Sequence, residues 1–536
     1  MKVADTLAAT LKAYGARWAF GIPGNDVLET VRACEEAGIG FVLGKSEPSC
    51  AFMADAVYQL TGQPAVLIPA LGPGISNAMS GIAGAMQERS AIAILCGEMA
   101  SKQMGIYNHQ VFDHVALARP VTKYAENLNP KRAAQQMAKA LDIALAYPAG
   151  PVFLNVPADY NREEASAEEP KSPVPRAVTQ LDGESVARLQ AKLAAAKRPL
   201  MLAGRGALIG NTPAAFARFV EAWKLPFFTT YKAKGIVNES HALCLGSVGL
   251  SPVVDAENLA LIKEADCIVL AGFDPIELRD AWLDAWPQSL SVVSIDWAGL
   301  NHRIFPVGEE ALGDVPAILG QLLPASAAKN EWKPERLVEL RTKVAHVVRP
   351  RSPAKAISPA ALFHAVSSQI KDDWILTVDV GAHRILANHV IQCRTPGQLM
   401  QSNGLGCMGY AVPAAIAAQL VHPQRTVVAM LGDGCMLMTQ GELALAAERE
   451  LPIVVVVLND AALALIKLKQ SKMNMSPRAT DFRSPDFAKI AEGFGAKGVR
   501  VDTIEAFGKA LADAVASRRF TLIDAHVDPS EYWEQM

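Results

Sequence analysis

The sequence lacks several features that mark whole classes of protein. A membrane-spanning helix needs about eighteen consecutive apolar residues, and no stretch of the sequence is that long. The most apolar run covers only residues 451–458. Basic residues form no arm or patch, and the net charge is −3, so we expect neither a membrane nor a nucleic acid as partner. The N-terminal residues carry Asp5 and Lys12 within a helical pattern and lack the apolar centre of a secretion signal.

Signals for disulfide bonds or zinc ligands are also missing. The eight cysteines are scattered along the chain, none forms a C-x-x-C pair, and most lie among apolar residues. This pattern is typical of reduced thiols in the cores of cytosolic proteins. Apolar residues make up 51% of the chain and charged residues 20%, which is an ordinary globular balance. We therefore expect a globular, cytoplasmic protein.

Two polar segments divide the 536 residues. Residues 161–182 mix charged side chains with three prolines, and residues 324–359 are poor in long apolar runs. Few contacts are expected to cross such segments, so both are predicted to be linkers. The length alone favours about three domains. The predicted domains are residues 1–160, 183–323 and 358–536.

Each predicted domain repeats one pattern of a short apolar strand, a turn with glycine and an alanine-rich amphipathic helix. Examples are AVLIPALGPG in the first domain, RPLMLAGRGA in the second and TVVAMLGDG in the third. Strands that are apolar throughout and alternate with helices are typical of parallel sheets covered on both faces. The sequence thus predicts an α/β fold with three doubly wound parallel-sheet domains. Ligands of such sheets bind at the carboxyl ends of the strands, where these glycine turns lie.

Two acidic residues follow successive strands of the third domain. The strand in TVVAMLGDG ends at Asp433, and the next strand, PIVVVVL, leads into Asn459 and Asp460. Carboxylates at strand ends can hold a hard cation such as Mg²⁺ that bridges to a diphosphate, and glycines such as Gly434 let the backbone approach the phosphates. Two unrelated turns with aspartate caps are the plainer alternative. The separation by one strand–helix–strand unit favours the metal site.

These motifs resemble those of thiamine-diphosphate-dependent enzymes of the acetolactate synthase and pyruvate decarboxylase superfamily. The resemblance covers nearly the whole chain and implies pyrimidine-binding, central and diphosphate-binding domains in that order. The family's motif is GDG followed by two asparagines, the second a metal ligand, and Asp460 stands in place of that second asparagine. The resemblance therefore implies Mg²⁺ held by Asp433, Asp460 and the backbone carbonyl of Ala462.

Further segments of the third domain resemble the family's cofactor site. In SNGLGCMGYAVPAAIAA, Met408 takes the place of the bulky residue beneath the bent cofactor, and the Gly406 carbonyl that of the acceptor for the aminopyrimidine. In VDVGAHR, Ala382 and His383 take the positions that contact the diphosphate. Each match alone is weak, since Met408 would suit a core and His383 a surface. Together and in order, with Gly434 as a further contact, they imply thiamine diphosphate as the cofactor.

The chemistry of this cofactor needs a carboxyl group that shares a proton with its pyrimidine ring, and Glu47 matches that group. It follows a predicted strand and begins the helix EPSCAFMADAVYQL, where the family has a His-Glu pair; here the histidine is Ser46. A helix N-terminus or Lys45 would also explain an acidic residue there. The nearby GPG turn and Asn77, which are also family features, favour the catalytic role. In the family this glutamate and the diphosphate site come from different subunits, which implies a homodimer or homotetramer with interface active sites.

The resemblance also assigns residues that face the substrate. In YNHQVFDHVALARP, Gln110 takes the place of a substrate-facing glutamine of the synthases, and His109 that of a phenylalanine. His109, Asp113 and His114 lack a recognised spacing for metal ligands, so we expect no metal there. Asn25, in the loop GIPGNDVLE, makes the pocket more polar than the small residues of the synthases do.

The helix after the metal motif separates the candidate reactions. Leu465 and Ile466 are conservative replacements for apolar residues of the synthases, whereas simple pyruvate decarboxylases carry a catalytic glutamate at the position of Ile466. An apolar pocket without that proton donor favours attack on a second carbonyl over release of an aldehyde. Lys469 stands where acetohydroxyacid synthases have a tryptophan. Two interpretations of Lys469 stay open: it recognises an anionic group of the substrate, or it shares a solvated helix face with Lys467 and Lys472.

The sequence predicts an acetolactate-synthase-like enzyme that decarboxylates a 2-oxo acid and joins the remaining acyl unit to an acceptor carbonyl. Catalysis is assigned to Glu47, with Gln110 and His109 orienting the substrate. A non-oxidative 2-oxo acid decarboxylase, or a C–C lyase acting on a ketol with the same cofactor, is the main alternative. An inactive protein that only binds the cofactor is a second alternative. The resemblance leaves open whether the central domain holds FAD or another nucleotide, as it does in some relatives.

Overall fold

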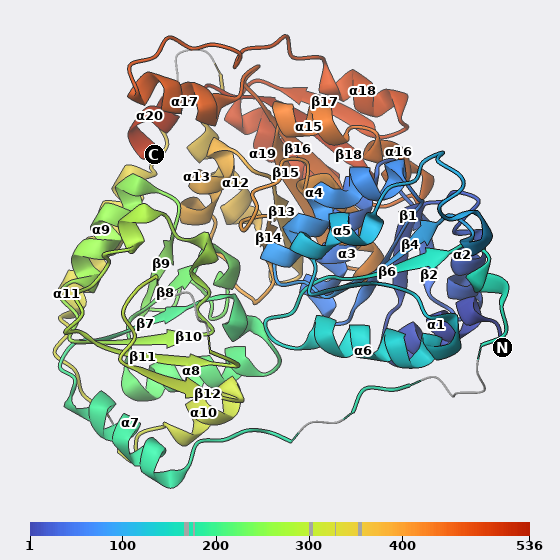
Figure 1. Cartoon of the computed structure of the whole chain (residues 1–536). Coiled ribbons are helices and arrows are strands. Elements are labelled where there is room, and N and C mark those ends of the chain that lie inside the picture. The colour runs from blue at the N-terminus through green and yellow to red at the C-terminus, as the bar shows by residue number, and fades with distance from the viewer. Residues whose placement is uncertain (166–170, 175–176, 300–303, 327, 352–355) are drawn as a thin grey trace.

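The architecture consists of three sheets with helices packed on their faces (Figure 1). Each sheet has six strands, and every strand pairs with its neighbours in parallel. The predicted α/β fold with three doubly wound parallel sheets is confirmed. Within the described ranges, no helix combines the length and the apolar character needed to cross a bilayer. The computed structural model describes residues 1–165, 171–174, 177–299, 304–326, 328–351 and 356–536.

The first sheet has the strand order β2-β1-β3-β4-β6-β5. Its central strands β3 and β4 are buried along their whole length, because helices cover both faces and every side chain of these strands except Glu98 is apolar or small. The strands are β1 (Trp18–Ile22), β2 (Gly40–Leu43), β3 (Ala65–Pro69), β4 (Ile92–Glu98), β5 (Tyr124–Asn127) and β6 (Val152–Pro157). The helices are α1 (Val3–Ala13), α2 (Leu28–Glu36), α3 (Glu47–Thr61), α4 (Pro73–Gln87), α5 (His114–Ala118) and α6 (Ala133–Leu145).

The central sheet has the order β12-β11-β10-β7-β8-β9, which is the order of dinucleotide-binding folds. Its strands are β7 (Pro199–Ala203), β8 (Phe227–Thr230), β9 (Cys244–Val248), β10 (Cys267–Ala271), β11 (Ser291–Asp296) and β12 (Glu309–Leu312). The α-helices that accompany them are α7 (Gly183–Ala195), α8 (Thr212–Trp223), α9 (Pro252–Ile262), α10 (Val315–Gln321) and α11 (Pro334–Val347).

The third sheet repeats the strand order of the first, as β14-β13-β15-β16-β18-β17. Its strands are β13 (Trp374–Val378), β14 (Leu399–Gln401), β15 (Thr426–Gly432), β16 (Val454–Asn459), β17 (Lys497–Val501) and β18 (Thr521–His526). Its helices are α12 (Pro359–Gln369), α13 (Ala382–Val390), α14 (Ala411–Val421), α15 (Asp433–Thr439), α16 (Glu442–Glu448), α17 (Ala464–Lys472), α18 (Phe487–Gly493), α19 (Ile504–Ser517) and α20 (Tyr532–Gln535).

The second predicted linker, residues 324–359, is wrong in part because it contains α11. This helix packs beside α9, and Leu337 and Leu340 lie in the hydrophobic core of the central domain. Their spacing of three residues is helical, but the charged residues between them and the prolines around the helix obscured it. Within the first predicted linker, residues 166–170 and 175–176 lie outside the described residues.

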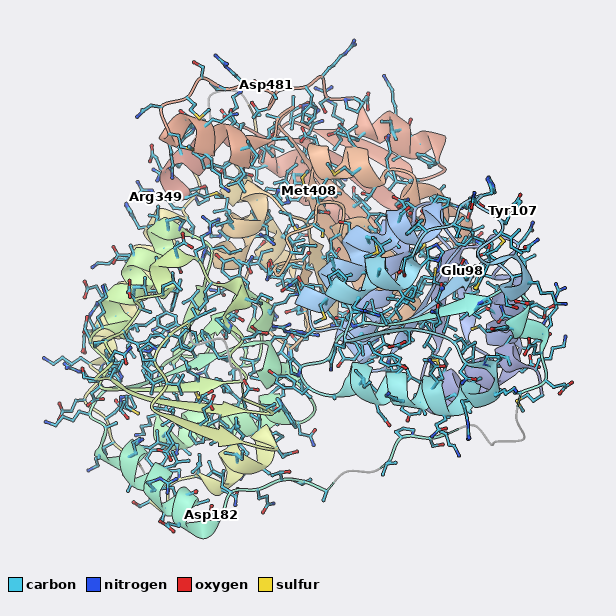
Figure 2. The ribbon with its side chains drawn as sticks, in the orientation of Figure 1. Glu98, Tyr107, Asp182, Arg349, Met408 and Asp481 are labelled. Atoms are coloured by element: carbon cyan, nitrogen blue, oxygen red, sulfur yellow. The ribbon has the colours of Figure 1, made fainter. Side chains whose placement is uncertain are left out.

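The first and third domains share one hydrophobic core. The cluster of buried side chains runs from α3 and α4 to α14, whose sequence AVPAAIAAQLV is apolar on every face. The rings of Phe52 and Tyr410 pack edge to face with their centroids 5.7 Å apart. Figure 2 shows Met408, two residues before that tyrosine, close to the border between these domains. The segment that resembles the family's cofactor site is thus fixed between two domains.

Candidate active site

The carboxyl ends of β15 and β16 meet at a cavity in the third domain. The two strands pair in parallel, so the residues that follow them lie at the same edge of the sheet. Asp433 and Asp460 both line this cavity. The side chain of Asn459 instead turns into the core and donates a hydrogen bond to Asp524 over 2.9 Å. The sequence prediction that the two aspartates face one crevice therefore agrees with the structure.

Backbone N–H groups hold both carboxylates in place. Asp433 Oδ1 accepts a hydrogen bond from the Gly434 N–H at 2.7 Å. Its Oδ2 accepts from the N–H groups of Asp460 and Ala461, at 3.2 and 2.6 Å. Ala461 has a φ of +57°, a strained left-handed conformation that turns these successive donors toward one oxygen. Asp460 Oδ1 accepts from the Ala462 N–H at 3.1 Å, which completes a rigid pair of carboxylates.

The electrostatics of this pair suit a divalent cation. Burial raises the pKa of Asp433 to about 6, and burial together with the neighbouring carboxylate of Asp433 raises the pKa of Asp460 to about 8. Two buried carboxylates repel each other unless a cation lies between them. Mg²⁺ prefers oxygen ligands, and this cavity offers both carboxylates and the backbone of Ala462. The donor set therefore fits the metal that the sequence implies.

The neighbouring wall of the cavity has the chemistry of an anion site. Helix α13 begins at Ala382, which lines the cavity, so the partial positive charge of the helix N-terminus lies there. Burial, with Arg384 nearby, lowers the pKa of His383 to about 3, and its Nε2 has no hydrogen-bond partner within the described structure. A Cβ at Gly434 would lie 2.9 Å from Cδ2 of Leu463, so a larger residue here would displace that side chain. These features fit a diphosphate.

Met408 lines the same cavity, and Gly406 precedes it with a φ of +69°. The chain after Met408 is anchored by Asp379, which sequence reasoning missed although it lies within VDVGAHR. Its carboxylate is fully buried and accepts hydrogen bonds from the N–H groups of Gly409 and Ala411, both at 2.9 Å. The motif that contains Asp379 matched the family, but the sequence alone did not show that the Asp379 carboxylate binds the backbone 30 residues further along the chain.

Helix α17 supplies an apolar wall to the cavity. Leu465 and Ile466 line it, as predicted. Lys469 is exposed and does not line it, while Lys467 forms a surface ion pair elsewhere. Tyr532, from α20 near the end of the chain, also lines the cavity and was not anticipated. No local pattern marks Tyr532, because the fold brings it from a remote helix.

Glu47 begins α3 in the first domain, as predicted, and its Oε2 accepts a hydrogen bond from Asn77 Nδ2 at 2.6 Å. The alternative partner, Lys45, pairs with Glu448 at 2.9 Å instead. Helices α3 and α4 approach closely because Gly81 has no side chain: a Cβ there would lie 2.5 Å from a side chain of α3. This contact is what brings Asn77 to Glu47.

Gln110 lies over the GPG turn. Its φ is +61°, and a Cβ at Gly72 would lie only 2.7 Å from its carbonyl oxygen. Gln110, His109 and Asn25 are exposed and Glu47 is half-buried. No described residue of the first domain lines the third-domain cavity. Within one chain, the structure thus brings together the metal-site and cofactor-site predictions and leaves these four residues in a separate, open region.

A buried polar cluster beneath the GPG turn was not anticipated. His114 Nε2 accepts a hydrogen bond from the Gly72 N–H at 3.2 Å, and its Nδ1 lies 3.0 Å from the carboxylate of Glu98. Asp26 accepts from the Leu71 N–H at 2.8 Å. Figure 2 shows Glu98 inside the first domain. The N–H groups of Leu71 and Gly72 therefore donate to the half-buried Asp26 and the buried His114, which fixes the start of the GPG turn.

Three family models match successive parts of the chain. They are the N-terminal TPP binding domain of thiamine pyrophosphate enzymes, over residues 1–117, the central domain, over residues 186–322, and the C-terminal TPP binding domain, over residues 379–525. The chain belongs to the thiamine pyrophosphate enzyme family. This membership confirms the resemblance that the motifs predicted.

Several relatives match this thiamine pyrophosphate enzyme over almost its full length. The probable acetolactate synthase large subunit of Methanocaldococcus jannaschii is 30% identical, with 99% of this chain and 93% of the relative covered. The acetolactate synthase of Bacillus subtilis is 28% identical, with 98% and 93% covered. The acetolactate synthase isozyme 1 large subunit of Escherichia coli is 29% identical, with 92% and 88% covered.

Proposed function

We propose that this enzyme is a carboligase of the acetolactate synthase type. It decarboxylates a 2-oxo acid and joins the remaining acyl unit to an acceptor carbonyl. The observation that carries the proposal is the apolar wall beside the aspartate pair: Leu463, Leu465 and Ile466 line the cavity of Asp433 and Asp460. The side chains of this wall supply no acid that could protonate the acyl unit before it reaches the acceptor carbonyl. Their apolar character also disfavours water, which could protonate it instead. The activity printed for the relatives agrees with this reaction.

The proposal gives each polar group of the cavity a task. Asp433, Asp460 and the carbonyl of Ala462 hold Mg²⁺, and the N-terminus of α13 with His383 binds the diphosphate. Gly406 and Met408 support the pyrimidine and the bend of the cofactor. Thiamine diphosphate, when bound, supplies the nucleophilic carbon that takes up the 2-oxo acid.

Glu47 exchanges a proton with the pyrimidine ring in this proposal. Asn77 donates to Oε2 of Glu47, so the hydrogen bond fixes the carboxyl group and leaves Oε1 to hold or release the proton. Gln110 and His109, on the open side of the GPG turn, orient the substrate. The strained backbone of Gln110 is consistent with a residue held for function.

We also infer that active sites form between two copies of the chain, in a homodimer or a homotetramer. The metal cavity and the carboxyl group of Glu47 lie apart in one chain, and a second copy would bring the two together. Large apolar side chains are exposed on both sides: Ile106, Tyr107 and Phe112 follow the first domain's β4, and Met438 lies on α15. Exposed apolar side chains gathered in this way mark protein interfaces.

A cytoplasmic location completes the proposal. All eight cysteines are unpaired, and all but one of them are buried. Free buried thiols are typical of proteins in a reducing compartment.

The decisive experiment measures CO₂ release and products from a panel of 2-oxo acids, with Mg²⁺ and thiamine diphosphate added. Wild type is compared with Glu47→Gln and with the control Glu448→Gln, an exposed glutamate that pairs with Lys45. We expect wild type and the control to release CO₂ and form a coupled ketol. Glu47→Gln is expected to lose almost all turnover, because the amide cannot give up a proton.

Other outcomes redirect the assignment. An aldehyde formed from a single oxo acid identifies a non-oxidative decarboxylase. No CO₂ from any oxo acid, with cleavage of a 2-hydroxy ketone, identifies a lyase. Failure of all these reactions leaves a protein that only binds the cofactor.

A further inference from the structure

The stretch that carries Gly406 and Met408, called here the cradle segment (residues 403–409), is held at both ends by buried carboxylates. Asp379 accepts hydrogen bonds at its downstream end, as described above. At the upstream end, one oxygen of Glu88 accepts from the N–H groups of Asn403 and Gly404, at 2.6 and 2.8 Å. Glu88 belongs to the first domain, so the cradle segment depends on a neighbouring domain for its position.

The backbone approaches Glu88 so closely that a side chain is excluded. A Cβ at Gly404 would lie 2.6 Å from Gln87 Cβ and 2.9 Å from the Gln87 carbonyl oxygen. Residues 87 and 88 end helix α4, the same helix that begins at the GPG turn. These two distances show that only glycine at position 404 lets the cradle segment pack directly against the end of α4.

The charge of Glu88 is balanced from the central domain. Lys232 lies just after β8, in the short 3-10 helix Tyr231–Ala233, at the carboxyl edge of the central sheet. Its Nζ contacts the Glu88 carboxylate and the Gln401 carbonyl, and it donates to Gln59 Oε1 at 3.1 Å. The side chains of Lys232 and Glu88 are only 5% and 3% exposed. One buried ammonium group therefore contacts all three domains.

Lys232 is the cation that contacts the Glu88 carboxylate. Asp55 is buried nearby, and burial and the charge of Glu88 raise its pKa, while Lys232 opposes that shift. Two buried carboxyl groups and one lysine share the site, and the nearby Arg205 donates to the backbone carbonyl of Glu88, at 2.7 Å, whereas Lys232 contacts its carboxylate. A buried carboxylate that loses its partner is strongly destabilising, so without Lys232 the helix end that carries Glu88 would shift and hold the two N–H groups of the cradle segment less firmly.

We propose that Lys232 is a positioning residue for the thiamine diphosphate site. From the central domain it holds the Glu88 carboxylate in place through the buried ion pair, and Glu88 in turn sets the position of the cradle segment. This inference rests on the proposed function, because it takes the cradle segment to support the cofactor. It gives the central domain a part in cofactor affinity although no residue of that domain lines the cavity in the part of the chain that is described.

The chain offers a matched control two residues further on. Lys234 forms an equally buried ion pair with Glu239, 2.8 Å long, with side chains 3% and 5% exposed. Glu239 accepts a hydrogen bond from the Cys393 N–H at 2.7 Å, so this pair also joins the central and third domains. It makes no contact with the cradle segment. A role in domain packing alone would make the two lysines equivalent.

The test measures binding of thiamine diphosphate with Mg²⁺ to the full chain by titration calorimetry, alongside thermal melting. We expect Lys232→Met to bind about tenfold more weakly or worse, because it leaves a buried carboxylate without its partner. The double variant Lys232→Met/Glu88→Gln removes both charges and should recover to within about threefold of wild type. Lys234→Met should lower the melting temperature but change affinity less than about twofold.

Unchanged affinity in Lys232→Met overturns the inference, and so does an equal loss in Lys232→Met and Lys234→Met. If Lys232→Met does not fold, Glu88→Gln decides alone: weaker binding by an intact fold supports the inference, and wild-type affinity overturns it. Wild type that fails to bind the cofactor overturns the proposed function itself. Wild type that binds, with Lys232→Met unchanged, removes only the role of Lys232.

Discussion

The two regions that hold the predicted catalytic residues differ in what one chain provides. In the third domain, Asp433 and Asp460 are fixed by backbone N–H groups and enclosed by the walls of one cavity. In the first domain, Glu47 is half-buried, and Gln110 is exposed beside exposed apolar side chains. The difference teaches that the proposed metal and diphosphate site is preorganised within one chain, while the residues proposed for proton exchange and substrate orientation lie in an open region outside that cavity.

The largest effect is expected at the metal carboxylates, the rigid side of this comparison. Asp433→Ala removes one proposed ligand and the acceptor for three N–H groups, so Mg²⁺-dependent binding of thiamine diphosphate should weaken by about a hundredfold or more. Asp460→Asn keeps an oxygen ligand and removes the repulsion between the carboxylates, so it should stay within about tenfold of wild type. Titration calorimetry distinguishes the two. Equal losses would show that ligand charge, not the position of Asp433, holds the metal.

Mixing two inactive variants tests whether the regions meet across an interface. Glu47→Gln and Asp433→Ala should each be almost inactive alone. Mixed dimers would contain one site with both changes and one intact site, so random reassociation of equal amounts should restore about a quarter of the wild-type activity. The assay is CO₂ release after joint refolding or coexpression. No recovery at all would place both groups in one chain's site.

The pH dependence of metal binding sharpens the view of the third-domain cavity. The pKa of Asp460 rises from 3.8 to about 8 in the folded chain, so it binds a proton more tightly when folded. The metal-free protein therefore loses stability as the pH rises from about 4 to about 8, and Mg²⁺ restores it. Mg²⁺ must displace the proton, so its affinity should be about tenfold weaker at pH 7 than at pH 9. Thermal melts with and without Mg²⁺ measure this; affinity independent of pH would contradict it.

The smallest effect is expected at Lys469. This side chain is exposed and does not line the cavity within one chain, so Lys469→Ala should change the KM for the 2-oxo acid by less than about twofold. Recognition of an anionic substrate group would instead raise KM by about tenfold. Lys472→Ala, on the same helix, is the matched control for a general change in surface charge.

The sequence predicted those features that depend on local pattern. The strands were recognisable because apolar runs such as residues 454–458 of β16 are buried on both faces, and Asp433 and Asp460 were paired because parallel strands end at one edge. Met408 and His383 followed from family motifs, and the structure brings both to the same cavity.

The remaining features arise from contacts between distant elements. His114 supports Gly72, Tyr532 reaches the metal cavity, and Lys232 reaches Glu88, each without a pattern in its own neighbourhood. A buried polar side chain is recognisable only when the packing that buries it is known. Helix α11 was missed for a related reason, because its few buried side chains lie among charged ones.

The unbroken core between α3 and α14 has a consequence for how the chain gains and loses order. If either the first or the third domain unfolds, the apolar side chains of the other domain that pack against it become exposed to water. The two domains therefore form one cooperative unit. The central domain has two cores of its own, but Val254 of α9 lies in the core of the third domain and the Lys232 ion pair joins the central domain to the first. Cleavage of the chain between the first and third domains would therefore not release two folded fragments.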